Sequence, residues 1–430
     1  MQEVHRTELM PGVHLTCVQT KKFKSSYWAL RLVTPLKAET AALNALMPQV
    51  LCRGTARWPD RQQLAAALEE LYGGVLEPTV TKRGESQCFG FAATFLDDGL
   101  TPEQTPLLDR EAELLGDLLL RPATRNGRFR AEYVTGERAN LMDDIKSAVN
   151  DKRQYALRRL VEEMCAGEDF GVSRLGSLAA AEKINVTRLD RHYRQVLPTA
   201  QVELYYCGSA SPRRMELVWR EALRDLPRQG RPEPPLTRWQ AEPRERRTVT
   251  ERMDVAQGKL VLGFRTGCTL SGRGYPALVV ANALFGGTPT SKLFLNVRER
   301  LSLCYYASSG LDKHKGLLYV QCGVAFENLA RAEEEILRQL EAVQAGDFTD
   351  GELDAARRAM VRAYRSMADS QNAQADYWLS QSLSELWLPP QELAQLLEDV
   401  TREEVIQAAQ KLRLDTVYTL RGPEGEEAQP

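Results

Sequence analysis

Histidine is scarce in this sequence of 430 residues, with only four, at positions 5, 14, 192 and 314. No two of them lie at a spacing that a helix turns into a pair of metal ligands. A zinc centre built from histidines of this chain alone is therefore hard to form. The eight cysteines are widely scattered and make no CxxC pair, which predicts buried, reduced thiols.

Long apolar runs and an excess of charge of one sign are also missing. No stretch reaches eighteen uninterrupted apolar residues, and the first twelve residues carry charges where a signal peptide needs an apolar run. Lys plus Arg (56) nearly balance Asp plus Glu (58), for a formal net charge of −2. We therefore expect a cytoplasmic protein with no membrane span and no nucleic-acid partner.

What the sequence does contain is a duplicated order of predicted elements. Each half reads as a strand pair, two helices, a hairpin and long helices. A segment rich in proline, glycine and charge separates the halves. This predicts an α+β protein with two tandem units, 1–225 and 246–430, joined by a linker at 226–245, each with helices on one face of a largely antiparallel sheet.

Helical periodicity is long in corresponding places of the two halves. One such segment covers about 131–165 and another about 349–386. We expect a long helical segment in each.

The stretch 285–310, FGGTPTSKLFLNVRERLSLCYYASSG, holds the most positional information. Gly286 and Gly287 allow positive φ and predict a backbone hinge. Thr288 and the proline after it predict the start of a helix that runs to about residue 300. A strand follows, so that Arg298 and Tyr305 fall on either side of a helix-to-strand turn, where they are placed to converge.

Two interpretations of Arg298 and Tyr305 stay open at this point. The arginine could complement the helix dipole while the tyrosine is an ordinary strand aromatic. Alternatively, a guanidinium and a phenol at one corner offer two hydrogen-bond donors to a peptide carbonyl or an oxyanion.

The duplicated order, together with FGGTPTSKLFLNVRERLSLCYY, resembles the M16 peptidases (pitrilysin-like inverted zincins) over nearly the whole chain. The resemblance implies two homologous units of the LuxS/MPP-like metallohydrolase fold that form one half of a clamshell. The spacing of seven residues matches the family's substrate-contacting arginine and tyrosine. It thereby assigns that role to Arg298 and Tyr305.

The first half departs from the M16 pattern at the metal site. Active members carry H-x-x-E-H on the first helix, with two zinc-binding histidines and a glutamate that activates water. In this chain Gly54-Thr55 matches the Gly-Thr that ends the family's first helix and so fixes the alignment. The segment A-L-M-P-Q then places Ala45, Pro48 and Gln49 at the positions of the two histidines and the glutamate. A methyl group cannot ligate zinc, proline has no carboxylate, and glutamine is a poor ligand.

Two further positions follow from the resemblance. The family's third ligand is a carboxylate on the long helix, preceded by another seven residues earlier. These positions are occupied by Asp144 and Glu137. We expect both to be solvated surface acids.

A missing H-x-x-E-H beside a retained arginine and tyrosine is typical of the non-catalytic partners in two-subunit M16 peptidases. Within the family the chain most resembles the bacterial YmfF-like subgroup. The resemblance implies no cofactor in this chain, a zinc-bearing M16 homologue as partner, and a peptide substrate. The leading hypothesis is a zinc-less subunit of a heterodimeric endopeptidase; the alternative is a non-catalytic peptide-binding or scaffold protein of the same fold.

Overall fold

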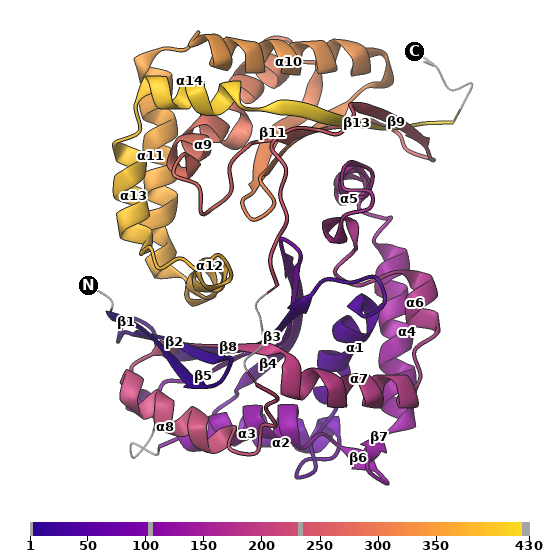
Figure 1. The fold of residues 1–430 in the computed structure, drawn as a ribbon, viewed down its shortest axis with the longest axis vertical. Coiled ribbons are helices and arrows are strands. Elements are labelled where there is room, and N and C mark those ends of the chain that lie inside the picture. Colours follow the sequence, from indigo (N-terminus) through magenta and orange to yellow (C-terminus); the bar gives the residue numbers. More distant parts are fainter. Residues whose placement is uncertain (1–2, 102–105, 231–234, 424–430) are drawn as a thin grey trace. The chain divides into compact units, whose positions relative to one another are not determined.

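The computed structural model describes residues 3–101, 106–230 and 235–423, so residues 231–234 of the predicted linker lie outside the described residues. The chain divides into two compact units, which together are shown in Figure 1. Unit 1 consists of Met1–Lys146, Val172–Leu236 and Gln371–Ser380. Unit 2 consists of Ser147–Gly171, Thr237–Ser370 and Gln381–Pro430. Each unit therefore contains a segment encoded in the other half of the sequence.

Unit 1 is built on a six-stranded sheet. Its strands are β1 (Glu3–Met10), β2 (Val13–Gln19), β3 (Ser25–Pro35), β4 (Val75–Arg83), β5 (Ser86–Leu96) and β8 (Gln201–Gly208). They lie in the order β1-β2-β8-β3-β5-β4, in which only the β2–β8 pair is parallel. A separate small hairpin pairs β6 (Thr124–Arg125) with β7 (Arg128–Phe129).

Helices cover this sheet on both faces, so the prediction of helices on one face only is wrong for unit 1. They are α1 (Ala41–Leu51), α2 (Arg61–Glu69), α3 (Leu108–Leu120), α4 (Ala131–Ser147), α6 (Leu178–Glu182), α7 (Val186–Thr199), α8 (Pro212–Ala222) and α12 (Gln371–Leu383). On β3, Trp28, Leu30 and Leu32 point into the main core with α1, α3 and α8. The alternate residues Ala29 and Arg31 face α12.

Unit 2 is built on a five-stranded sheet. Its strands are β9 (Arg247–Arg252), β10 (Gly258–Arg265), β11 (Cys304–Asp312), β12 (Leu317–Val324) and β13 (Arg413–Arg421). They lie in the order β11-β12-β10-β13-β9, and only the β13–β9 pair is parallel.

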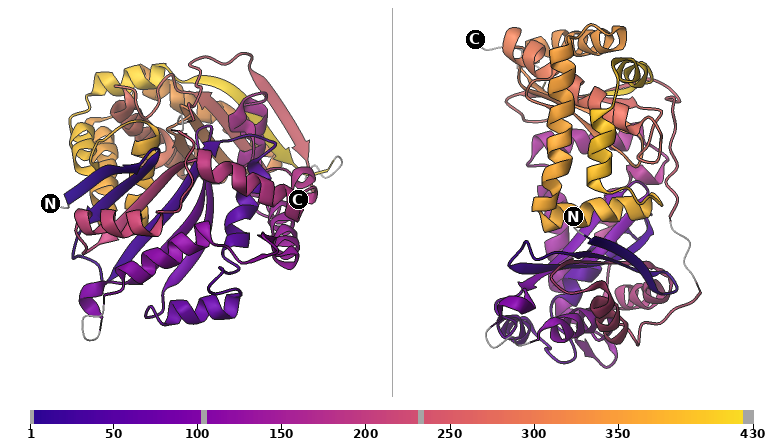
Figure 2. Two further views of the ribbon diagram at one scale, coloured as in Figure 1. Left: turned by 60° about the horizontal axis from the view of Figure 1, so that its bottom comes forward. Right: turned by 90° about the vertical axis from the view of Figure 1, so that its left-hand side faces the viewer.

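The helices of unit 2 include two π-helices. They are α5 (Lys152–Met164), α9 (Tyr275–Asn282), α10 (Leu329–Ala345), α11 (Asp350–Ser366), α13 (Pro390–Glu398), α14 (Arg402–Gln410) and the π-helices η4 (Ala283–Gly287) and η5 (Leu293–Arg300). Short 3₁₀ turns occur in unit 1 at Asp98–Leu100 and in unit 2 at Asp169–Gly171, Phe326–Asn328 and Met367–Asp369. Helices α11 and α13 run side by side (Figure 2).

The two sheets have the same topology once β1 is set aside. The order β2-β8-β3-β5-β4 in unit 1 corresponds to β9-β13-β10-β12-β11 in unit 2, with the one parallel pair at the same edge. The predicted α+β fold with two tandem homologous units is confirmed. Among the described residues, no helix is long and apolar enough to cross a membrane.

The long helical segments are each broken, which the periodicity did not predict. The first splits into α4 and α5, and Asp151 starts the second helix by accepting hydrogen bonds from the backbone N–H groups of Arg153 and Gln154. The second splits into α11 and α12. After each break the helix packs in the unit encoded mainly by the other half.

Candidate functional site

The positions that correspond to H-x-x-E-H lie on α1, in the core of unit 1. Ala45 is 2% exposed and Pro48 is buried within the helix, while Gln49 is half-buried. Proline at this position also removes an N–H from the helix ladder. At these three positions the helix therefore offers two apolar side chains and one neutral amide, whereas a zinc site needs imidazoles and a carboxylate.

The residue before Ala45 ties α1 to its surroundings through neutral polar groups. The Asn44 side chain is fully buried and donates to Gln87 Oε1 at 2.9 Å. His192 Nε2 lies 2.6 Å from Asn44 Oδ1. Burial lowers the pKa of His192 to about 4. The histidine is thus a neutral structural group, and it points to asparagine rather than to a metal.

Glu137 on α4 forms ion pairs with two arginines. Its Oε1 accepts from Arg53 Nη1 at 3.0 Å and from Arg61 Nη2 at 3.1 Å, and its Oε2 accepts from Asn140. The Arg53 guanidinium also lies over the Tyr133 ring, 5.1 Å from its centroid. The expectation that Glu137 is a solvated surface acid is wrong, because the residue is only 2% exposed. A buried carboxylate needs such partners.

Asp144, one helical turn from the end of α4, is exposed as expected. Across the described residues, no group of three or more His, Cys, Asp or Glu side chains is arranged to hold a metal ion. With two cations already bound to Glu137, the residues at the corresponding positions do not fit zinc.

Gly286 and Gly287 lie in η4, and neither takes a positive φ. The positive φ on which the predicted hinge depended is therefore absent. The two glycines are explained instead by the lack of room for a side chain. A Cβ on Gly286 would lie 2.6 Å from Leu293 Cδ1, and one on Gly287 would lie 2.8 Å from Asn282 Nδ2. The glycines let the chain after α9 pack closely.

Arg298 lies in η5, where the backbone N–H of Leu301 donates to the carbonyl of Asn296 at 3.1 Å, five residues back. Such π-helical turns are frequent at functional sites. The Arg298 guanidinium stacks over the Phe294 ring, 4.6 Å from its centroid, and its side chain remains 41% exposed. Its Nε lies 3.6 Å from Oε1 of the neighbouring Glu299.

Tyr305 is the extra residue of a β-bulge at the start of β11. The pairing with β12 passes from Cys304 opposite Val324 to Tyr306 opposite Gly323, so that Tyr305 has no partner on β12. Bulges of this kind re-aim a side chain and are common beside active sites. The Tyr305 side chain is turned outward and is 74% exposed.

The structure brings Arg298 close to the residue before Tyr305. The hydrogen bond with Cys322, and the Arg298 charge, lower the pKa of the Cys304 thiol against the effect of burial. Among the described residues, no hydrogen bond joins Arg298 to Tyr305 directly. The η5 helix, which carries Arg298, and β11, which carries Tyr305, thus meet at one corner of unit 2.

Arg153 is a neighbour of this corner that the sequence did not indicate. It comes from α5, and its guanidinium lies over the Tyr306 ring, 4.4 Å from the centroid. It also donates to Ser308 Oγ and Gln321 Oε1, both at 3.1 Å. No local pattern links a residue at 153 to a strand that begins 151 positions later, so only the structure reveals the contact.

The sequence is similar to those of known proteins over most of its length. Residues 183–360 match the family model for the peptidase M16 inactive domain. The chain is 32% identical over 415 residues to the probable inactive metalloprotease YmfF of Bacillus subtilis, covering 96% of this chain and 97% of that protein.

Solved structures show the same fold. A conserved protein from Enterococcus faecalis superimposes with a TM-score of 0.89 at 26% identity, over 99% of this chain and 100% of that one. The peptidase M16 inactive domain from Pseudomonas fluorescens superimposes with a TM-score of 0.80 at 16% identity, with coverage of 99% and 100%.

Proposed function

The chain belongs to the peptidase M16 family as an inactive metalloprotease-like member, and from this premise we propose that it is the zinc-less subunit of a heterodimeric M16 endopeptidase. The observation that carries the proposal is a contrast between two places in the chain. The face of α1 has lost every metal-binding group, whereas Arg298 and Tyr305 remain exposed beside a bulge and a π-helix.

In this role the partner, a zinc-bearing M16 homologue, supplies the metal and the attacking water. Arg298 and Tyr305 donate hydrogen bonds to the peptide carbonyl of the substrate, or to the oxyanion that forms from it. The π-helix and the bulge suit this task because both fix a side chain away from regular packing. The chain binds no cofactor of its own in this proposal.

The test is peptide hydrolysis by this chain mixed with a zinc-bearing M16 homologue from the same genome. We expect activity only in the mixture. Arg298→Ala should lower kcat at least tenfold, since loss of an oxyanion donor typically costs about 10²–10³-fold. Tyr305→Phe, which removes only the hydroxyl, should lower kcat in the same direction while the zinc content of the complex stays unchanged.

Arg300→Ala is the matched control, because Arg300 is an exposed arginine at the end of the same π-helix. It should leave the turnover of the mixture unchanged. Equal activity of the Arg298→Ala and wild-type complexes would refute the assigned role, and activity of the chain alone would refute the subunit model.

A second candidate function is a peptide-binding or scaffold protein without a part in catalysis. The observation in its favour is that β11 is an edge strand of the unit 2 sheet and carries the exposed Tyr305. An extended peptide adds to such an edge through main-chain hydrogen bonds. Peptide binding by the isolated chain, combined with a mixture that never hydrolyses peptide, would favour this function over the first.

A further inference from the structure

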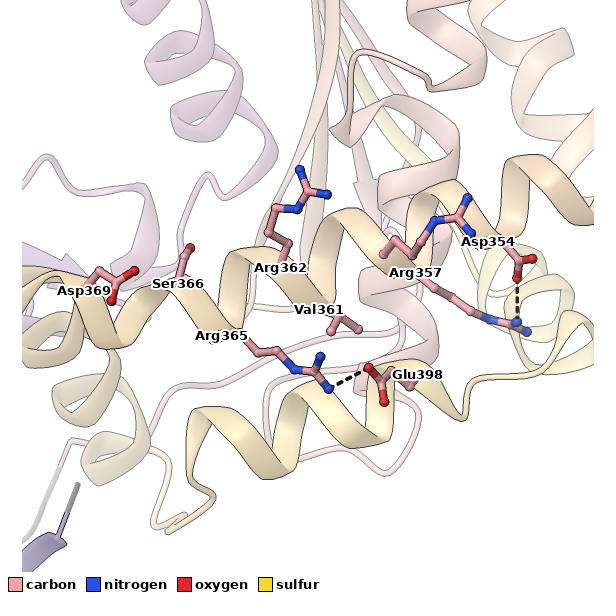
Figure 3. Close-up of a pocket in the computed structure, with 9 residues that line it drawn as sticks. Asp354, Arg357, Val361, Arg362, Arg365, Ser366, Asp369 and Glu398 are labelled. Atoms are coloured by element: carbon pink, nitrogen blue, oxygen red, sulfur yellow. Dashed lines mark hydrogen bonds and ion pairs between the residues drawn. The ribbon is translucent and has the colours of Figure 1, made fainter. Parts of the chain in front are cut away.

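Helix α11 lines a groove of about 690 Å³ that lies within unit 2 (Figure 3). Four arginines line it, namely Arg357, Arg358, Arg362 and Arg365. The buried side chain of Val361 contributes apolar surface, and the acids Asp354, Asp369 and Glu398 also line the groove.

Two of the four arginines are neutralised by neighbours. Arg357 Nη1 lies 3.2 Å from Asp354 Oδ1 on the preceding turn. Arg365 Nη2 lies 2.7 Å from Glu398 Oε1 on α13. Figure 3 shows Arg365 pointing toward Glu398. The first pair lies within α11 and the second joins α11 to α13, and each leaves no net charge.

The other two arginines have no such partner. Within the described part of the chain, neither Arg358 nor Arg362 forms an ion pair or a hydrogen bond, and both are exposed. Figure 3 shows Arg362 projecting to the side of α11 away from Glu398. The two residues are four positions apart, where like charges face each other and destabilise a helix.

The duplication shows that this pair is not a general feature of the fold. Helices α4 and α11 have the same length of 17 residues, and each is the first part of the broken helical segment of its half. The ninth and thirteenth residues of α4 are Ala139 and Asp143, whereas those of α11 are Arg358 and Arg362. The helix at this point in the order of unit 1 therefore forms without arginine at these two positions.

We propose that the α11 groove binds an acidic segment of a polypeptide, with a carboxylate held between Arg358 and Arg362. Guanidinium groups match carboxylates in shape and in hydrogen-bond geometry. The paired acids and the apolar floor favour a peptide over nucleic acid, whose sites present continuous positive charge. Asp369 repels a second carboxylate at its own end of the groove and so limits where the acidic residues of the ligand lie.

The experiment is fluorescence anisotropy of the full chain with a labelled short peptide of alternating Glu and Ser. The same peptide with Lys in place of Glu is the charge control. We expect the Glu peptide to bind and the Lys peptide not to bind. Affinity should fall from an ionic strength of about 0.01 M to about 0.15 M, because the Debye length shrinks from about 30 Å to about 8 Å.

The variant R358A/R362A should weaken binding of the Glu peptide about tenfold or more. Its matched control is R125A/R128A, which removes two exposed arginines from the β6–β7 hairpin of unit 1 and should leave the affinity within about twofold. The charge-reversed R358E/R362E should lose the Glu peptide and gain the Lys peptide.

Because both arginines are exposed, circular dichroism should show an unchanged fold for each variant. The proposal is overturned if the wild-type chain does not bind the Glu peptide, or if R358A/R362A binds it as tightly as the wild type does. It is also overturned if a short single-stranded DNA binds the groove more tightly than the Glu peptide.

Discussion

Two segments pack away from the half of the sequence that encodes them, and different chemistry holds each one. After α5, in unit 2, Glu168 Oε2 lies 2.6 Å from Lys315 Nζ and Glu168 Oε1 lies 3.1 Å from Arg265 Nη2. In α12, in unit 1, Gln371 Nε2 donates to the backbone carbonyls of Ser25 at 2.8 Å and Cys207 at 2.9 Å. Buried ions thus join the segment after α5 to its sheet, whereas neutral hydrogen bonds join the start of α12 to β3 and β8.

The degree of burial makes this difference important. The side chains of Lys315 and Arg265 are 0% and 3% exposed, and Arg265 also pairs with Asp415 at 2.8 Å. The ion pair of α12, between Asp376 and Arg83, has side chains that are 55% and 23% exposed. Equal topology therefore does not imply equal energetics. We therefore expect the loss of one ionic partner to destabilise the anchor of α5 strongly, and the loss of one hydrogen bond to destabilise the anchor of α12 weakly.

The largest expected effect is that of Glu168→Ala. It leaves two buried cations without their shared carboxylate, and breaking a buried pair in this way costs about 3–5 kcal/mol. We expect the free energy of unfolding to fall by that amount. Hydrogen exchange should show the loss in peptides from β10 and β13 of unit 2.

Asp376→Ala is the matched control on α12. Its pair with Arg83 is partly exposed, so we expect a change of about 0–1 kcal/mol. Similar losses in the two variants would mean that the two anchors do not differ as their burial implies.

A second difference is how stability responds to a fall in pH. His192 is neutral in folded unit 1, with a pKa of about 4, and takes its ordinary value near 6.5 when unfolded. Below pH 6.5 the unfolded state binds a proton that the folded state does not. The stability that the neutral histidine supplies is therefore complete above pH 6.5 and is lost as the pH falls toward 4. Between pH 7 and pH 5 we expect a loss of about 2 kcal/mol.

The measurement is urea unfolding of the wild type and of His192→Gln at both pH values. The variant should lose less stability than the wild type on acidification. The anchor of α5 should not contribute over this range. Burial opposes ionisation of Glu168, but the charges of Lys315 and Arg265 lower the pKa of Glu168 below its usual value. Equal acid sensitivity in both proteins would contradict the role of His192.

The sequence predicted much of the fold because periodicity and turn residues act locally. The duplicated order, the strands and the sites of α1 and α2 all follow from such patterns. The exchange of segments between the units does not, because the helical periodicity of the sequence continues across the break at Asp151. Where the second part packs depends on distant partners such as Arg265, which no local pattern connects to it.

The candidate site was predictable to a similar degree. The register from Gly54-Thr55 placed Ala45, Pro48 and Gln49 on α1. The burial of Glu137 was not predictable, since its partners Arg53 and Arg61 precede it by 84 and 76 positions. The bulge at Tyr305 also escaped the sequence, because an alternating strand pattern carries no mark of an extra residue.

The α12 anchor is tested by Gln371→Glu, which keeps the length of the side chain but removes both N–H donors. The two carbonyls of Ser25 and Cys207 then face a carboxylate instead of an amide. Because a neutral hydrogen bond contributes about 0.5–1.5 kcal/mol, we expect a loss of about 1–2 kcal/mol. Gln371→Ala should lose a similar amount; a loss in Gln371→Ala alone would show that packing, not donation, holds α12.

The smallest expected effect tests how closely α5 lies on its sheet. A Cβ on Gly263 of β10 would lie 2.7 Å from Met164 Sδ and 3.0 Å from Leu160 Cδ2. Both atoms belong to flexible side chains, so Gly263→Ala should cost about 1 kcal/mol, at the low end of overpacking. Gly310→Ala on β11 is the control, because a Cβ there meets no atom within 4 Å.

The double variant Gly263→Ala with Met164→Ala should relieve the clash, and a double-mutant cycle from urea unfolding measures the coupling between the two residues. Additive losses in that cycle would mean that α5 does not rest on Gly263.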